Sequence, residues 1–153
     1  MTNRLAAALA LATAIAIPAE GLRQYAYRDP AGILTVCYGT TGSEVVVGKH
    51  YGLSECIGFL NEDMRHALET VESCHPGLPE QVLAAFADAV YNIGPAVACD
   101  STASRHLAAG NLVAACEQLP RWNKARIAGA YVALPGLTNR RAKERELCLQ
   151  GVA

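Results

Sequence analysis

The chain has 153 residues, of which 52% are hydrophobic, so it is long and apolar enough to bury a core, and a disordered chain is excluded. Its formal net charge is −1, but the charge is unevenly distributed: residues 1–120 have a net charge of −6, and residues 121–153 have a net charge of +5. The basic end suits either an acidic polymer or a solvated helix face. Only Trp122 and Tyr131 lie among these bases, too few aromatic residues for a stacking platform, so we expect no nucleic-acid partner.

The N-terminus carries an apolar run over residues 5–19 behind a single basic residue, Arg4. A secure transmembrane helix needs about 20 apolar residues, so this run predicts an uncleaved export segment that associates weakly and transiently with the inner membrane. A cleaved signal peptide is a second interpretation, although cleavage after Ala19 would leave Glu20 as the new N-terminus. An ordinary buried N-terminal helix is the third.

The following elements alternate between short strands and helices. Turn and β-branched residues predict a hairpin up to residue 39, and residues 45–47 predict a third short strand. Apolar residues at helical spacing predict a long helix over 54–74, and residues 121–137 are expected to be less regular. Further helices are expected over 79–93, 102–109, 112–118 and 138–150. This order predicts an α+β, mostly α fold, in which the long helix joins a small β-hairpin lobe to a larger helical lobe, with a cleft between them.

Three oxygen-bearing side chains stand at fixed separations near the predicted hairpin. Glu20 ends the apolar run, Asp29 follows nine residues later in an Asp-Pro-Ala-Gly turn, and Thr35 lies six residues further in a predicted strand. Taken singly, they are typical of a helix end, a turn and a strand. Together they offer an acid that protonates a glycosidic oxygen and a carboxylate that activates water. Apolar neighbours favour the protonated form of Glu20, whereas solvent keeps Asp29 ionised.

Six cysteines are spread along the chain: Cys37, Cys56, Cys74, Cys99, Cys116 and Cys148. Their even number indicates three disulfides and an oxidising compartment, and fifteen connectivities are open. There is no Cys-x-x-Cys pair, and the four histidines lack metal-ligand spacing. We therefore expect no metal and no cofactor.

Several strings match one family in order. They are Glu-Gly-Leu-Arg (20–23), Thr-Val-Cys-Tyr-Gly (35–39), Tyr-Asn-Ile-Gly (91–94), Arg-Trp (121–122), Gly-Leu-Thr-Asn-Arg-Arg (136–141) and Glu-Arg-Glu-Leu-Cys-Leu (144–149). Glu20, Asp29 and Thr35 are also separated by the nine and six residues found in this family. From Glu20 to about Val152 the chain therefore resembles the phage-type lysozymes of glycoside hydrolase family 24, especially the secreted endolysins of lambdoid phages. The resemblance divides the chain into an N-terminal segment, 1–19, and a lysozyme-like catalytic domain, 20–153.

The resemblance implies a muramidase that hydrolyses the β-1,4 bond between N-acetylmuramic acid and N-acetylglucosamine in peptidoglycan, for host lysis and phage release. It implies a monomer exported to the host periplasm. Glu20 would be the general acid, while Asp29 orients the attacking water and Thr35 helps to place it. Arg141 would approach the catalytic glutamate from the last helix, and Asn92 would contact the substrate. The alternatives are a non-catalytic wall-binding module, which the intact triplet disfavours, and a disulfide-stapled structural domain, which leaves the carboxylate spacing unexplained.

The disulfide pairs that follow from the resemblance are Cys37–Cys56, Cys74–Cys99 and Cys116–Cys148. Two stretches depart from the family pattern. Thr40 stands where the family usually has histidine, a residue that pairs with an aspartate matching Asp63, so Thr40 offers at most an uncharged hydrogen bond. Residues 126–134 also differ, which leaves the cleft rim there undefined.

Overall fold

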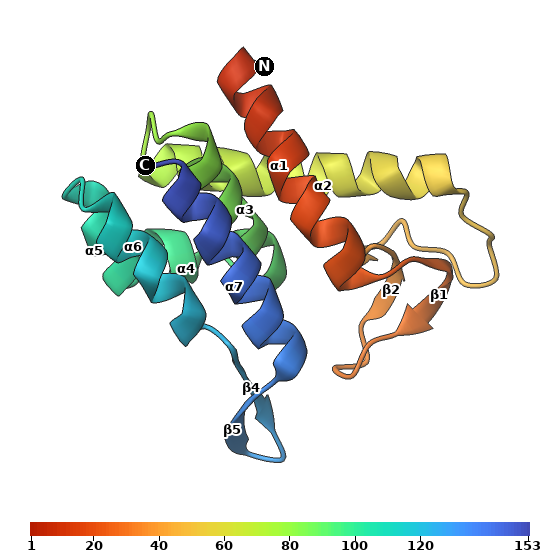
Figure 1. Ribbon diagram of the computed structural model, residues 1–153. Helices are drawn as coiled ribbons and strands as arrows, with labels where there is room; N and C mark the ends of the chain where they lie inside the picture. Colours follow the sequence, from red (N-terminus) through yellow and green to blue (C-terminus); the bar gives the residue numbers. More distant parts are fainter.

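The elements fall into two groups at opposite ends of one long helix. The computed structural model describes residues 1–153. The helices are α1 (Asn3–Glu20), α2 (Leu53–Cys74), α3 (Glu80–Ile93), α4 (Ala96–Cys99), α5 (Thr102–Ala108), α6 (Leu112–Gln118), the 3-10 turn η1 (Leu119–Arg121) and α7 (Pro135–Gln150). The strands are β1 (Arg23–Arg28), β2 (Leu34–Cys37), β3 (Thr40–Thr41), β4 (Lys124–Ile127) and β5 (Ala130–Ala133). Figure 1 shows β1 and β2 at one end of α2 and the helical group at the other, so the predicted two-lobed, mostly α fold is confirmed.

Helix α3 forms the centre of the helical lobe. All eight of its residues from 82 to 89 are buried, and α1, α2 and α7 pack around it. Asp88 is the one charged residue in that stretch and is fully buried. A buried carboxylate is costly unless it is paired, so its partner must come from a neighbouring helix.

Helix α1 packs on this centre through small side chains. Ala8, Ala12 and Ala16 are fully buried, and their size allows α1 to lie close to α3. The side chain of Arg4 forms an ion pair with Glu72 of α2, which fixes the other end of the helix. The helix runs unbroken across the expected division at residue 19 and ends on Glu20. Among the helices of this fold, none combines the length and apolarity that a membrane crossing requires.

The β lobe is a three-stranded antiparallel sheet in the order β1-β2-β3. Tyr27 pairs with Thr35, and Val36 pairs with Thr40. The prediction of a strand over residues 45–47 is wrong. The backbone there is satisfied locally, because the Val45 N–H donates to the Gly42 carbonyl and the Val46 N–H to the Tyr51 hydroxyl.

Three disulfides tie the elements together: Cys37–Cys56, Cys74–Cys99 and Cys116–Cys148. These are the pairs that the resemblance implied. The first joins β2 to the start of α2, and the third joins α6 to α7. Both lobes and the C-terminal helix are therefore held by covalent links as well as by packing.

Strands β4 and β5 form a second hairpin between the helical lobe and α7, where the sequence had suggested irregular structure. The turn residues Ala128 and Gly129 have φ values of 50° and 85°. Two consecutive positive φ values are typical of a type I′ turn, whose twist matches that of the paired strands. Figure 1 shows this hairpin extending away from the helices.

Candidate active site

Glu20 is held by an arginine from the far end of the chain. Its Oε1 accepts a hydrogen bond of 2.6 Å from Nη1 of Arg140, which lies on α7. The side chain of Glu20 is 22% exposed, whereas that of Arg140 is 4% exposed. The carboxylate is therefore fixed from behind by a buried cation and open to solvent in front.

The same guanidinium pairs with Asp88 of α3. Nε and Nη2 of Arg140 donate to the two oxygens of Asp88 at 2.9 and 2.7 Å. Burial alone would lower the pKa of Arg140, but the hydrogen bonds and charge of Asp88, together with Glu20, outweigh it and raise that pKa. Arg140 thus stays charged, and Asp88 is the partner that makes its burial tolerable.

The prediction that Arg141 approaches Glu20 is wrong. Adjacent residues of a helix point to different sides, and the side chain of Arg141 makes its hydrogen bonds to groups other than Glu20. Its Nη2 donates to Asn92 Oδ1 and to Glu144 Oε2, both at 2.8 Å. Arg141 and Glu144 are fully buried. Arg141 therefore orients Asn92 rather than Glu20.

Glu144 completes a buried charge network with these groups. Burial, followed by the hydrogen bond and charge of Asp88, raises the pKa of Glu144 well above 4.5, against the opposing effect of Arg141. The network contains three carboxyl groups, from Glu20, Asp88 and Glu144, and two guanidinium groups. The carboxyl groups therefore outnumber the cations by one, and burial favours the neutral form of Glu144.

Gly39 brings the β lobe against Glu20. Its φ of 95° is unfavourable for other residues, and a Cβ atom there would lie 3.3 Å from Glu20 Oε2 and 3.4 Å from the Tyr91 hydroxyl. That hydroxyl donates to the Tyr38 carbonyl at 2.5 Å. Burial, and then the charges of Glu20 and Asp63, raise the pKa of Tyr91, so it remains a neutral hydrogen-bond donor. Glu20 is thus confined between α7 and the β2–β3 turn.

Asp29 shapes the β1–β2 turn while keeping one oxygen available. Its Oδ1 accepts from the backbone N–H groups of Ala31 and Ile33, at 2.9 and 2.8 Å. Thr35 is 4% exposed, and its hydroxyl donates to the Ile33 carbonyl at 2.9 Å. The Thr35 oxygen can therefore only accept a hydrogen bond from a bound water. The three predicted residues lie on consecutive elements, the end of α1, the β1–β2 turn and β2.

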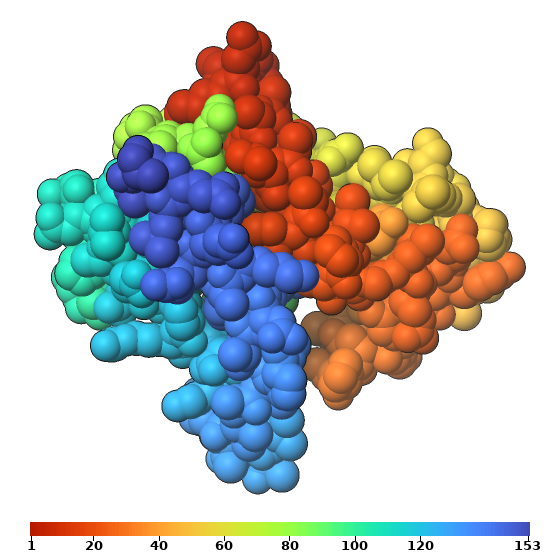
Figure 2. Space-filling view, viewed as in Figure 1, coloured from red at the N-terminus to blue at the C-terminus, as the bar shows by residue number.

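Two hollows flank this region. The larger, about 500 Å³, is lined by Glu20, Asn92, Leu134, Arg140 and Lys143, among other residues. Figure 2 shows that the surface is hollowed between the orange β lobe and the blue β4–β5 hairpin. The residues that line the larger hollow come from the end of α1, from α3 and from α7 with its N-cap Leu134, so this hollow opens beside Glu20 on the helical lobe.

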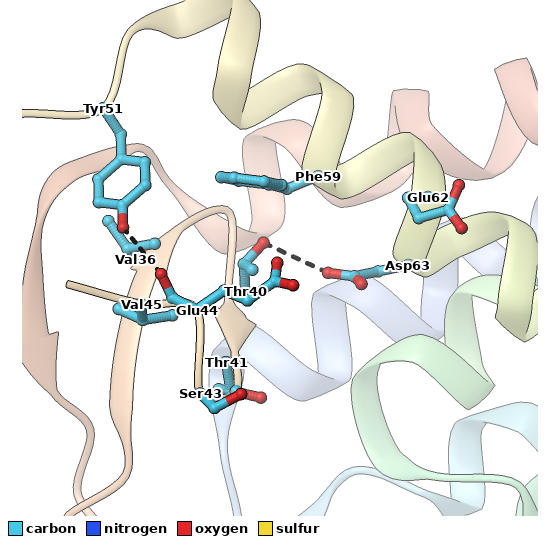
Figure 3. A pocket seen from close by; sticks show the side chains of 11 residues that line it. Val36, Thr40, Thr41, Ser43, Glu44, Val45, Tyr51, Phe59, Glu62 and Asp63 are labelled. Atoms are coloured by element: carbon cyan, nitrogen blue, oxygen red, sulfur yellow. Dashed lines mark hydrogen bonds between the residues drawn. The ribbon is translucent and has the colours of Figure 1, made fainter.

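The smaller hollow, about 270 Å³, lies between the β lobe and α2. In Figure 3, Thr40 and Asp63 face each other across it, and Thr40 Oγ1 donates to Asp63 Oδ2 at 3.3 Å. Burial raises the pKa of the half-buried Asp63, and the single hydrogen bond from Thr40 only partly opposes this. This is the uncharged contact expected from the replacement of histidine by Thr40.

The two lobes joined by α2, with a partly exposed carboxyl at the end of α1 beside a hollow, define the protein as lysozyme-like, a class that cleaves glycosidic bonds with paired carboxyl groups. No group of three or more His, Cys, Asp or Glu side chains is placed to hold a metal ion.

The chain belongs to the phage lysozyme family, whose family model matches residues 18–144. It is 37% identical over 136 residues to the SAR-endolysin of Bacteriophage PS119, covering 86% of this chain and 77% of that one. It is 35% identical over 133 residues to the SAR-endolysin of Enterobacteria phage P21, covering 86% and 78%. Its fold superimposes on the endolysin from Escherichia coli O157:H7 phage FAHEc1 with a TM-score of 0.81 and 30% identity, covering 94% of this chain and 90% of that chain. The predicted family, fold and enzyme class are confirmed, and the protein is an endolysin-type lysozyme.

Proposed function

We propose that this endolysin hydrolyses the β-1,4 bond between N-acetylmuramic acid and N-acetylglucosamine with Glu20 as its general acid. The observation that carries the proposal is the setting of Glu20, which is partly exposed to the cleft and held at 2.6 Å by Arg140. A general acid must keep its proton until the leaving oxygen arrives. Asp88 already balances the charge of Arg140, and the guanidinium orients the Glu20 carboxyl through a single hydrogen bond.

Asp29 is the proposed base that activates the attacking water. Its Oδ1 is occupied by two backbone N–H groups, which hold the carboxylate in one orientation and leave Oδ2 for the water. Thr35 would accept a second hydrogen bond from the same water. Attack by water from the side of Asp29 inverts the anomeric centre, and it requires the carboxyl groups of Glu20 and Asp29 to lie roughly 6.5–9.5 Å apart.

Three single variants test these roles on outer-membrane-permeabilised bacteria. Glu20→Gln keeps the shape of the side chain and removes its proton, so lysis should be abolished while the fold is retained. Asp29→Asn should lose most activity, and Thr35→Ala should lose activity because the water is no longer held. Glu146→Gln, at an exposed site of α7, is the matched control and should lyse like the unmodified protein.

Two outcomes would overturn the proposal. Full lysis by Glu20→Gln would remove Glu20 from the mechanism. Early-time NMR of the products that showed the β-anomer first would exclude inversion. A wall-binding module without catalysis would instead bind sacculi and release no reducing sugar.

Export and a transient membrane association are proposed for the N-terminal segment. The support is the apolar run over residues 5–19 and the name SAR-endolysin carried by the relatives. We expect a monomer in the host periplasm that keeps these residues. Mass spectrometry of the secreted protein should find residues 1–20 intact, and a mature N-terminus at Glu20 would contradict this proposal.

A further inference from the structure

The β4–β5 hairpin presents two different faces to solvent. In its register Arg126 pairs with Tyr131, and Lys124 pairs with Ala133, so the cations and the tyrosine share one face. The opposite face carries Ile127 and Val132, which are 49% and 41% exposed. A two-stranded hairpin is marginally stable alone, and the most extensive contacts of β4 and β5 are with each other. Its exposed side chains are therefore available to a partner.

The charge of this segment has one sign. No aspartate or glutamate occurs between Glu117 and Glu144, whereas Arg121, Lys124 and Arg126 are all exposed. The Arg126 guanidinium lies over the Tyr131 ring, 4.7 Å from its centroid. This contact orients the guanidinium and leaves its N–H groups unpaired with any carboxylate. The hairpin is thus complementary to a chain of carboxylates.

The hairpin is continuous with the cleft. Its ends are joined by the hydrogen bond from the Leu134 N–H to the Asn123 carbonyl, 3.0 Å. Leu134 itself lines the hollow that contains Glu20. Figure 2 shows the blue hairpin projecting from the helical lobe at the edge of that hollow. A polymer that lies in the cleft and extends toward this lobe would pass along the hairpin.

We propose that the β4–β5 hairpin binds the carboxylates of the stem peptides of peptidoglycan and so holds the glycan strand in the cleft. The proposal rests on the proposed function, because it assumes a peptidoglycan strand at Glu20. The muramic acid residues of such a strand carry peptides with free carboxylates, at intervals along the polymer. Lys124 and Arg126 would pair with these groups, and Tyr131 would cover the adjacent apolar peptide or sugar surface.

A sedimentation assay tests the hairpin separately from catalysis. All proteins carry Glu20→Gln, so that sacculi are not digested during binding. The probes are intact sacculi and sacculi whose stem peptides have been removed by an amidase. The hairpin variant is Lys124→Gln/Arg126→Gln, and the control, Lys49→Gln/Arg105→Gln, removes the same charge at exposed sites elsewhere.

At low salt the hairpin variant should bind intact sacculi roughly 2- to 30-fold more weakly than the control, and the gap should close as salt is raised. The two proteins should bind stripped sacculi equally. Tyr131→Ala should weaken binding to intact sacculi without changing the melting temperature, since Tyr131 is 67% exposed.

Equal binding of the two charge variants to intact sacculi would overturn the proposal. Equal loss on intact and stripped sacculi would also overturn it, because the glycan rather than the peptide would then be the ligand. Loss of binding to anionic phospholipid vesicles, with sacculus binding unchanged, would assign the hairpin to a membrane surface instead. Failure of the proposed function is a different result, in which the unmodified protein releases no reducing sugar from sacculi.

Discussion

Asp88→Asn is the substitution that most directly tests the charge network behind Glu20. Asp88 is fully buried and accepts two hydrogen bonds from Arg140, at 2.9 and 2.7 Å. Asparagine keeps the shape and one acceptor oxygen but removes the charge. Breaking one side of a buried ion pair costs about 3–5 kcal/mol, in line with two charge-assisted hydrogen bonds at roughly 1.5–3 kcal/mol each. For a chain of this length the melting temperature should fall by roughly 6–20 °C.

The same substitution should change the pH dependence of lysis. Without the charge of Asp88, the guanidinium of Arg140 faces Glu20 uncompensated and favours its carboxylate form. The limb of the pH–rate profile on which Glu20, the proposed general acid, loses its proton should therefore move to lower pH. Thermal unfolding followed by circular dichroism, and lysis rates between pH 4 and 9 below the melting temperature, measure the two effects.

Asp100→Asn is the matched control, because Asp100 is exposed. It should leave both measurements unchanged. An Asp88→Asn protein that melts within about 2 °C of the unmodified protein and keeps the same limb would refute the reasoning, since neither the stability nor the charge balance at Glu20 would then depend on Asp88.

Three further outcomes follow from other features. The raised pKa of Glu144 means that the folded protein holds a proton that the unfolded chain loses above about pH 4.5, so the free energy of unfolding falls as pH rises through that range. Glu144→Gln should remove this pH dependence. A difference in unfolding free energy between the two proteins, measured in urea, that stays constant between about pH 4.5 and neutral would contradict the prediction. Gly39→Ala should cost about 1–3 kcal/mol of backbone strain and displace Glu20, so lysis should be on the order of 10–100-fold slower. A lysis rate equal to that of the unmodified protein would contradict this expectation. Cys116→Ala/Cys148→Ala should lower the unfolding free energy, measured in urea, by about 3–4 kcal/mol. An unchanged urea concentration at the unfolding midpoint would show that this disulfide does not stabilise the fold.

Sequence patterns predicted the features that depend on local chemistry or on ordered motifs. The apolar run that ends at Glu20 is a helix ending there, and the turn and strand that carry Asp29 and Thr35 form as expected. The two-lobed fold followed from the order of the elements. Such features are visible because each one is encoded within a few neighbouring residues.

The missed features depend on how helices rotate against one another. Arg140 and Arg141 are adjacent, and only the packing of α7 on α3 decides which one reaches Glu20. Asp88 was not identified from the sequence, although a lone acid in an otherwise apolar helical segment is a signal of a buried ion pair. The β4–β5 hairpin was missed because its turn is Ala128-Gly129, which lacks the asparagine or aspartate typical of such turns.

The contact between Glu20 and Arg140 joins residues that are 120 positions apart. At a synthesis rate of about 5–20 residues per second, roughly 6–24 s separate the translation of the two. Once the β lobe has been made, a nascent chain contains Glu20, Asp29 and Thr35 but still lacks the helix whose Arg140 holds Glu20. Glu20 therefore gains its buried cationic partner only after α7 has been made, and a chain that stops before α7 lacks this contact altogether.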